Sequence, residues 1–190
     1  MSRNSRHDVI VTARRLFAQR GFHGTSMRDL GKELGLLGSS LYSHVGSKDE
    51  LLVDVVQEAS VQFQGLADEV AAMEAPADDR LARLIEGHLE ILSKDPDQAR
   101  TFLDETRFLP DDDRHEAIAL MDRYQGVFRE VIADGQRTGR FRTDLDVHLA
   151  ANLTLSLLNG TSRWYQPDGS LSVPELAHDC LLYTSPSPRD

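Results

Sequence analysis

The chain has 190 residues, of which 40% are hydrophobic and 27% are charged, a balance typical of one or two small globular domains. It has no apolar run of about eighteen residues, which argues against a membrane-spanning helix. Its single cysteine, Cys180, excludes an intramolecular disulfide and a thiolate zinc site. The net charge is −10, but residues 1–52 carry +3 and the remaining residues carry −13. A basic N-terminal segment followed by acidic residues is compatible with a negatively charged partner that binds the N-terminal segment.

Residues 5–20 are the first predicted helix, because apolar side chains recur there every three to four residues. Gly21 breaks this pattern. Ser26 and Asp29 then form a capping box, in which the two side chains satisfy amides at a helix start. A short helix therefore begins here and ends at Gly35, since a left-handed terminal residue costs least at glycine.

A second short helix follows, passes through Leu41 and Tyr42, and stops near Gly46. Ser47 and Glu50 make another capping box, which opens a longer helix. Two short helices joined by a glycine-containing turn describe a helix-turn-helix, whose second helix can lie in the major groove of DNA. DNA binding is therefore the leading hypothesis.

Three motifs in a fixed order carry a family resemblance: ARRLFAQRGFHGTSMRDLGKELG, SSLYSHV and SKDELL, all between Arg14 and Leu52. This set resembles the DNA-binding domain of the TetR family of bacterial repressors. The resemblance implies a three-helix DNA-binding domain over residues 1–52. Hydroxyl, phenol, imidazole and ammonium groups in this segment are the expected contacts to phosphates and base edges, namely Thr25, Ser39, Ser40, Tyr42, Ser43, His44 and Lys48.

Some of these residues have a structural alternative, and their neighbours depart from the family pattern. Tyr42 can instead pack its ring in the core, and Thr25 can serve as a cap only. Family members usually have Ser or Thr, a capping residue, at the position of Leu37, and Gly38 and Ser39 also differ from the common pattern. An apolar N-cap typically costs about 1 kcal/mol. Which side chains read the bases therefore stays open.

The rest of the chain is also expected to be helical, and no strand-like alternation interrupts it. Prolines, glycines and caps delimit helices over residues 47–73, 78–93, 95–110, 111–138 and 147–165, and a last helix begins at the Ser172/Glu175 capping box. The helix over 47–73 is long enough to join the head to the body. We expect an all-α fold of about nine helices, the last one truncated.

The truncation follows from the last eleven residues, CLLYTSPSPRD, which resemble the translation of a sequencing-library transposase adapter. The alternative is a natural Pro/Ser-rich disordered end. The adapter interpretation accounts for every residue to Asp190 and makes Asp179 the last native one. The expected organisation is a DNA-binding domain over 1–52, a ligand-binding and dimerisation domain over 53–179, and a non-native tail over 180–190.

Residues 53–179 resemble, more loosely, the ligand-binding and dimerisation domain of the same family. The segments FLDETRFLP, NGTSRWYQPDG and LSVPEL are similar to members that sense acyl-CoA thioesters. Polar groups on mostly apolar helices are candidates for the ligand pocket, namely His88, Glu105, Arg107, Arg123, Asn159 and Trp164. Each of these residues can instead form an ion pair, lie in the core or at the surface with its hydrogen bonds satisfied, or belong to a protein interface. A stripe on the helix over 147–165 implies a four-helix dimer interface, formed by Leu149, Leu153, Leu157, Gly160 and Trp164.

Together these patterns predict a cytoplasmic, homodimeric transcriptional regulator that binds a palindromic operator in double-stranded DNA. We expect a repressor that a small hydrophobic or acyl-CoA-type ligand releases from DNA. An enzyme is not expected, because the sequence lacks a nucleophile elbow, a phosphate loop and an HExxH motif. Neither a metal nor a cofactor is expected. The alternative is a helical adaptor that binds a partner protein without sequence-specific DNA binding.

Overall fold

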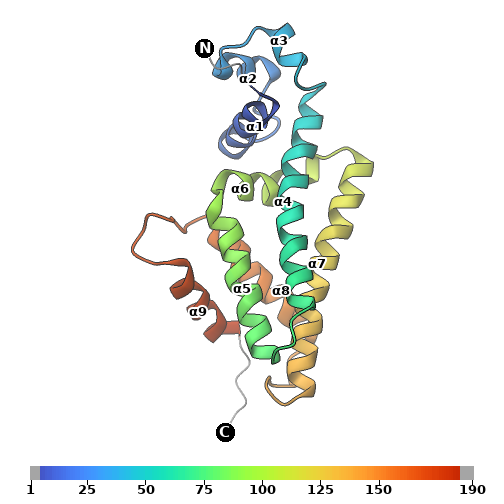
Figure 1. The fold of residues 1–190 in the computed structure, drawn as a ribbon, viewed down its shortest axis with the longest axis vertical. Helices are drawn as coiled ribbons and strands as arrows, with labels where there is room; N and C mark the ends of the chain where they lie inside the picture. Colours follow the sequence, from blue (N-terminus) through green and yellow to red (C-terminus); the bar gives the residue numbers. More distant parts are fainter. Residues whose placement is uncertain (1–4, 185–190) are drawn as a thin grey trace. The chain divides into compact units, whose positions relative to one another are not determined.

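The computed structural model describes residues 5–184, and within them the chain forms nine α-helices, one 3₁₀ helix and no strand (Figure 1). In chain order the elements are α1 (Arg6–Arg20), α2 (Met27–Leu34), α3 (Gly38–Tyr42), α4 (Lys48–Ala71), α5 (Ala77–Lys94), α6 (Pro96–Glu105), η1 (Thr106–Phe108), α7 (Asp111–Arg137), α8 (Val147–Thr161) and α9 (Val173–Thr184). The expected all-α fold is confirmed. Among the described helices, none is both long and apolar enough to cross a membrane.

The chain divides into two compact units. Unit 1 comprises the residues up to Ser60 together with Asp95–Ile118, so it holds α1, α2, α3, α6, η1 and the first parts of α4 and α7. Unit 2 comprises Val61–Lys94 and the residues from Ala119 onward, so it holds α5, α8, α9 and the remainder of α4 and α7. Unit 1 is therefore discontinuous in sequence, because it joins residues 95–118 to the helix-turn-helix near the start of the chain.

Capping boxes begin two helices of unit 1. Ser5 caps α1 and Ser26 caps α2, and in each case the acidic residue three positions later returns a hydrogen bond to the cap. The Ser26 hydrogen bonds lower the pKa of Asp29, because they favour its carboxylate form. Gly35 ends α2 in the left-handed conformation with φ of 64°, as predicted from the glycine.

The capping box expected at Ser47 is only half formed. The Ser47 hydroxyl accepts a hydrogen bond from the Glu50 amide at 3.0 Å. The Glu50 carboxylate, however, accepts one from the Gly46 amide at 2.7 Å and one from the Arg6 guanidinium at 2.9 Å. These contacts lower the pKa of Glu50, and they tie the start of α4 to α1.

The core of unit 1 consists of apolar side chains on the predicted inner faces of α1, α2, α3 and α4, together with Phe22 from the turn after α1. Buried members include Val9, Ala13, Leu16, Phe17, Phe22, Leu30, Leu41, Leu51 and Leu52. Leu34 is only half-buried. Unit 1 also brings α6 against α1, where the Thr101 hydroxyl donates to the Arg14 carbonyl at 3.0 Å.

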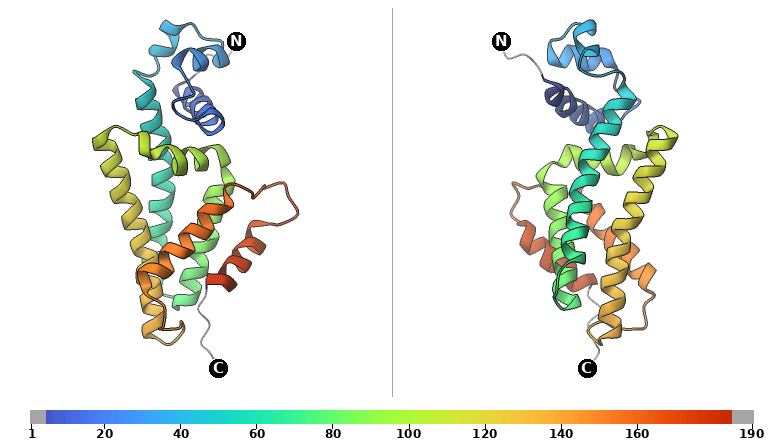
Figure 2. Two further views of the ribbon diagram at one scale, coloured as in Figure 1. Left: turned by 180° about the vertical axis from the view of Figure 1, so that it is seen from behind. Right: turned by 45° about the vertical axis from the view of Figure 1, so that its right-hand side comes forward.

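Unit 2 packs α9 alongside α5, and α8 contacts both helices (Figure 2). The buried side chains of α5 include Leu81, Leu84, Ile85 and Leu89, and those of α9 include Leu176 and Cys180. The stretch from Val173 continues as one helix to Thr184, so α9 extends past Asp179, the expected last native residue, into the expected tail. Residues 185–190 of the expected tail lie outside the described residues.

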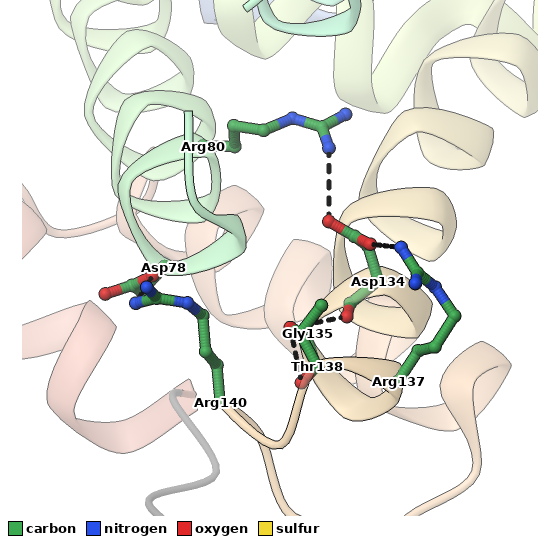
Figure 3. Close-up of polar contacts among 7 residues, drawn as sticks. All are labelled: Asp78, Arg80, Asp134, Gly135, Arg137, Thr138 and Arg140. Atoms are coloured by element: carbon green, nitrogen blue, oxygen red, sulfur yellow. Dashed lines mark hydrogen bonds and ion pairs between the residues drawn. The ribbon is translucent and has the colours of Figure 1, made fainter. Parts of the chain in front are cut away.

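The end of α7 is fixed to α5 by charged groups (Figure 3). The Asp134 carboxylate lies 3.7 Å from the guanidinium of Arg80 and also pairs with Arg137. The Thr138 hydroxyl donates to the Asp134 carbonyl at 2.8 Å, and Arg140 pairs with Asp78 of α5 at 2.6 Å. These contacts hold the turn after α7 within unit 2.

Two predicted helix ends were wrong. The helix over 95–110 stops at Glu105 and tightens into η1, because the Thr106 hydroxyl bonds the Phe102 carbonyl and because Leu109, which precedes a proline, is extended. The helix over 147–165 stops at Thr161, where the hydroxyls of Thr161 and Ser162 capture carbonyls of the last turn.

Candidate DNA interface and buried polar cluster

Helix α3 and the two residues that follow it present a mostly uncharged surface. Ser39, Tyr42 and Ser43 are exposed, Tyr42 to 55%, so the phenol ring is not part of the core. Ser40 and His44 are half-buried. The Ser43 hydroxyl donates to the Ser40 carbonyl at 2.7 Å, which holds it against the helix end. Five predicted contact residues therefore lie together on or next to α3.

The N-terminus of α3 is the irregular part of this surface. Leu37 occupies the N-cap position, makes no side-chain capping bond, and is 78% exposed. Gly38 follows in open space, since a Cβ there would meet no heavy atom within 4 Å. Ser39 makes no capping bond in place of Leu37 in the described structure. The departure from the family pattern thus leaves an apolar side chain in water where a capping hydroxyl usually stands.

Lys48 is engaged within unit 1. Its ammonium donates to the carbonyls of Phe22 at 2.8 Å and Thr25 at 2.9 Å, and it lies 4.1 Å from the centre of the Phe22 ring. Lys48 remains half-buried, with a third N–H donor beyond these two bonds. Its main contribution in this structure is to hold the turn before α2, and its phosphate contact stays a prediction.

Thr25 is also used by the fold. Its side chain is 1% exposed, and its hydroxyl lies within hydrogen-bond distance of the carbonyls of Leu16 and Gly21, at 3.2 and 3.0 Å. Thr25 is therefore not the cap of α2, which is Ser26, but its hydroxyl has a structural role at the end of α1. A DNA contact by Thr25 stays a prediction from the resemblance. The exposed cations of α2, Arg28 and Lys32, were not among the predicted contacts, although their charge and their place in the motif could have indicated them.

The turn held by Lys48 is also held from the other side. The amide of Phe22 donates to the Glu105 carboxylate at 2.8 Å, and Glu105 is 9% exposed at the end of α6. Phe22 also stacks on Phe108 of η1. Glu105 had been predicted as a pocket group, and Arg107, predicted likewise, lies over the Phe108 ring at 4.7 Å. Both belong to unit 1.

A second polar group is buried in unit 2. His88 of α5 is 2% exposed, with Nδ1 3.1 Å from the Tyr124 hydroxyl and Nε2 3.0 Å from the Asn159 side-chain oxygen. The Phe63 ring packs against both His88 and Tyr124. Burial lowers the pKa of His88 to about 4 and raises that of Tyr124, so both groups are neutral at physiological pH.

We call His88, Tyr124 and Asn159 the buried polar cluster. The structure thus brings together His88 and Asn159 of the six predicted pocket residues. Tyr124 was not among the predicted pocket residues, although a phenol on a buried stripe requires a hydrogen-bond partner. Arg123 pairs with Asp68 at the surface of unit 2, and Trp164 is 58% exposed.

The α8 stripe predicted for dimerisation is exposed. Leu149, Leu153 and Leu157 are 47%, 55% and 40% exposed, and Gly160 has open space at its Cβ position. With Trp164, the three leucines account for half of the eight large apolar side chains that are exposed among the described residues. Three of these side chains lie on α8 and Trp164 lies just after it, and such a group of exposed apolar side chains is typical of a surface that another protein covers.

Two family descriptions match this chain. "Bacterial regulatory proteins, tetR family" matches residues 9–55, and "Tetracyclin repressor-like, C-terminal domain" matches residues 74–184. The HTH-type transcriptional repressor KstR2 of Rhodococcus jostii (strain RHA1) is 27% identical over 177 residues, which cover 93% of this chain and 87% of the relative.

Solved structures give the same result. The TetR-family regulator PfmR from Thermus thermophilus superposes with a TM-score of 0.85 at 29% identity, and the match covers 96% of this chain and 99% of that one. AibR in complex with isovaleryl coenzyme A and operator DNA has a TM-score of 0.85 at 22% identity, with 98% of this chain and 100% of that one covered, which shows the shared fold.

Proposed function

We propose an operator and an effector for this chain from one premise, that the chain belongs to the TetR family of bacterial regulatory proteins. As a member, it is a DNA-binding, ligand-responsive transcriptional regulator that acts as a homodimer. Membership favours this function over the adaptor alternative, and the family's members are regulators and not enzymes. The proposal is that it represses transcription from a palindromic operator and leaves that operator when an acyl-CoA thioester binds. Because its target would be chromosomal DNA, we place it in the cytoplasm.

The operator proposal is carried by one observation, the exposed α3 surface within the segment that matches the family's DNA-binding domain. We assign backbone contacts to Tyr42 and His44, and groove contacts to the α3 residues Ser39 and Ser40 with Ser43 beside them. Two copies joined through the exposed α8 stripe would present two such surfaces, and two-fold symmetry then requires a palindrome.

The effector proposal rests on the chemistry of the buried polar cluster. The Asn159 oxygen can only accept, so the neutral His88 ring donates from Nε2 and accepts the Tyr124 hydroxyl proton at Nδ1. The side-chain NH₂ of Asn159 is then the donor for a carbonyl oxygen, and no group of the neutral cluster compensates the charge of a free carboxylate. A thioester carbonyl therefore suits the cluster better than the corresponding fatty acid. The similarity of residues 53–179 to acyl-CoA-sensing members, and the isovaleryl coenzyme A bound by AibR, support the same class.

Operator binding is tested by fluorescence anisotropy with the intergenic DNA upstream of the chain's own gene. Affinity should fall steeply with salt, because phosphate contacts release counterions. Tyr42→Ala should weaken binding, while Ile118→Ala, which truncates an exposed side chain at 52% exposure away from α3, should not. Equal affinity for this DNA and for a scrambled duplex would refute operator recognition.

Effector binding is tested by titrating acyl-CoA thioesters of different chain lengths into the protein–DNA complex. Tyr124→Phe removes the cluster's phenol hydroxyl and should raise the thioester concentration needed for release, with operator affinity unchanged in its absence. Arg123→Ala, which removes a surface ion pair one residue away on α7, is the matched control. Release by the free fatty acid at the same concentration as by its thioester would contradict the proposed class.

A further inference from the structure

Leu37 is the side chain on this surface that the fold does not explain. It is 78% exposed, so it contributes little to the core, and it replaces a capping residue without making a capping bond. A cap would satisfy an amide at the start of α3. The chain therefore forgoes a local hydrogen bond and exposes an apolar group at the beginning of the helix that is expected to enter the groove.

In α3, residues Gly38, Ser39, Ser40 and Leu41 distinguish poorly between the four base pairs. Gly38 has no side chain, Leu41 is buried, and the hydroxyls of Ser39 and Ser40 can donate or accept, so they fit any base edge. None of the residues from 37 to 43 has the amide or guanidinium group that makes bidentate contacts to adenine or guanine. In the major groove, the C5-methyl of thymine is the one apolar group, and only thymine carries it.

We propose that Leu37 determines sequence specificity by packing on the C5-methyl group of one thymine in each operator half-site. This inference rests on the proposed operator binding, and it specifies the base that Leu37 contacts, thymine, and the group on that base, the C5-methyl. The apolar side chain that is exposed in the free protein loses its contact with water when the methyl group covers it. The interaction is thus formed only in the complex with DNA.

The size of the effect follows from the methyl group. Removing one buried CH₂-sized group corresponds to about fourfold in affinity, and to about fifteenfold when both half-sites are changed. Uracil in place of thymine removes this methyl and leaves the hydrogen-bonding edge unchanged, so it isolates the contact from every polar contribution.

The test begins with selection of a preferred duplex from random DNA by the full chain. Each thymine is then replaced by uracil, and the affinity ratio between the two duplexes is measured by competition. We expect one symmetric pair of positions with a ratio of about fifteen. Leu37→Ala should bring this ratio to about one, and Leu37→Met, which keeps an apolar side chain, should leave it well above one. Circular dichroism checks that each variant is folded.

Ile118→Ala is the matched control, because it truncates another exposed apolar residue of unit 1 and should keep the wild-type ratio. A ratio near one at every position, or a ratio that survives Leu37→Ala, overturns the assignment while operator binding stands. If the selection yields no preferred sequence, both the assignment and the operator proposal are overturned.

Discussion

Acidification should destabilise this protein through one residue, His88. In the folded chain its imidazole is buried between Tyr124 and Asn159, and burial lowers its pKa from 6.5 to about 4. In the unfolded chain the imidazole takes up a proton near its ordinary pKa. Between these two values the unfolded state binds more protons, so the free energy of unfolding decreases as the pH falls from 6.5 toward 4.

The magnitude follows from the shift. One pKa unit corresponds to about 1.4 kcal/mol, so the full loss is about 3 kcal/mol, of which about 2 kcal/mol has occurred by about pH 5. The free energy of unfolding typically decreases by about 2 kcal/mol per molar urea. The urea concentration at the unfolding midpoint should therefore fall by about 1 M between about pH 7.5 and about pH 5 because of this residue.

The assay compares wild-type protein with His88→Gln, which cannot titrate in this range and retains hydrogen-bonding groups. Urea unfolding is followed by circular dichroism at both pH values and at one protein concentration, because dimer formation makes the midpoint depend on concentration. The six other histidines are present in both proteins, so the difference between the two pH effects isolates His88. A second variant, Tyr124→Phe, keeps the titrating imidazole and should retain most of the pH effect.

Equal pH dependence in wild-type protein and His88→Gln would refute this reasoning, because it would mean that the imidazole is protonated as easily in the folded chain as in the unfolded one. A larger pH dependence in the variant would contradict the sign of the argument.

Three further predictions concern other parts of the molecule. Lys48→Met, which removes the ammonium that bonds Phe22 and Thr25, should destabilise the fold by about 2 kcal/mol in urea unfolding; unchanged stability would assign Lys48 to DNA alone. Leu153→Glu should place a charge in the α8 stripe and yield a monomer in sedimentation velocity, and a dimer as tight as wild type would exclude this face. Leu37→Ser should supply the missing cap and stabilise the protein by about 1 kcal/mol in thermal unfolding; a decrease would show that α3 needs the leucine.

The helices could be predicted from the sequence because their limits are set by local chemistry. Ser26, Asp29 and Gly35 define α2 through hydrogen bonds and a left-handed turn that span only a few residues. The predicted ends failed at Glu105 and Thr161, where hydroxyls bonding back to the helix compete with the apolar spacing that favours its continuation.

The candidate sites were less predictable because they depend on partners far away in the sequence. Lys48 bears a charge and was expected at a phosphate, but the carbonyls that it binds lie 23 and 26 residues earlier. The contact between His88 and Asn159 spans 71 residues, and no local pattern distinguishes it from the other polar residues of these helices. The α8 stripe, by contrast, follows from one helical period, and its leucines are exposed, while their role in dimerisation stays a prediction.

The two-sided hold on Phe22 has a consequence for protein engineering. Its amide binds Glu105 of α6 and its carbonyl binds Lys48 of α4, while Thr101 of α6 binds the carbonyl of Arg14. A chimera that transplanted only the first sixty residues onto another regulator would keep Lys48 but leave α6 behind, so the Phe22 amide would lose its acceptor Glu105 and the Arg14 carbonyl its donor Thr101. The transferable module is therefore discontinuous in sequence, and a working graft has to carry residues 95–118 along with the DNA-reading helices.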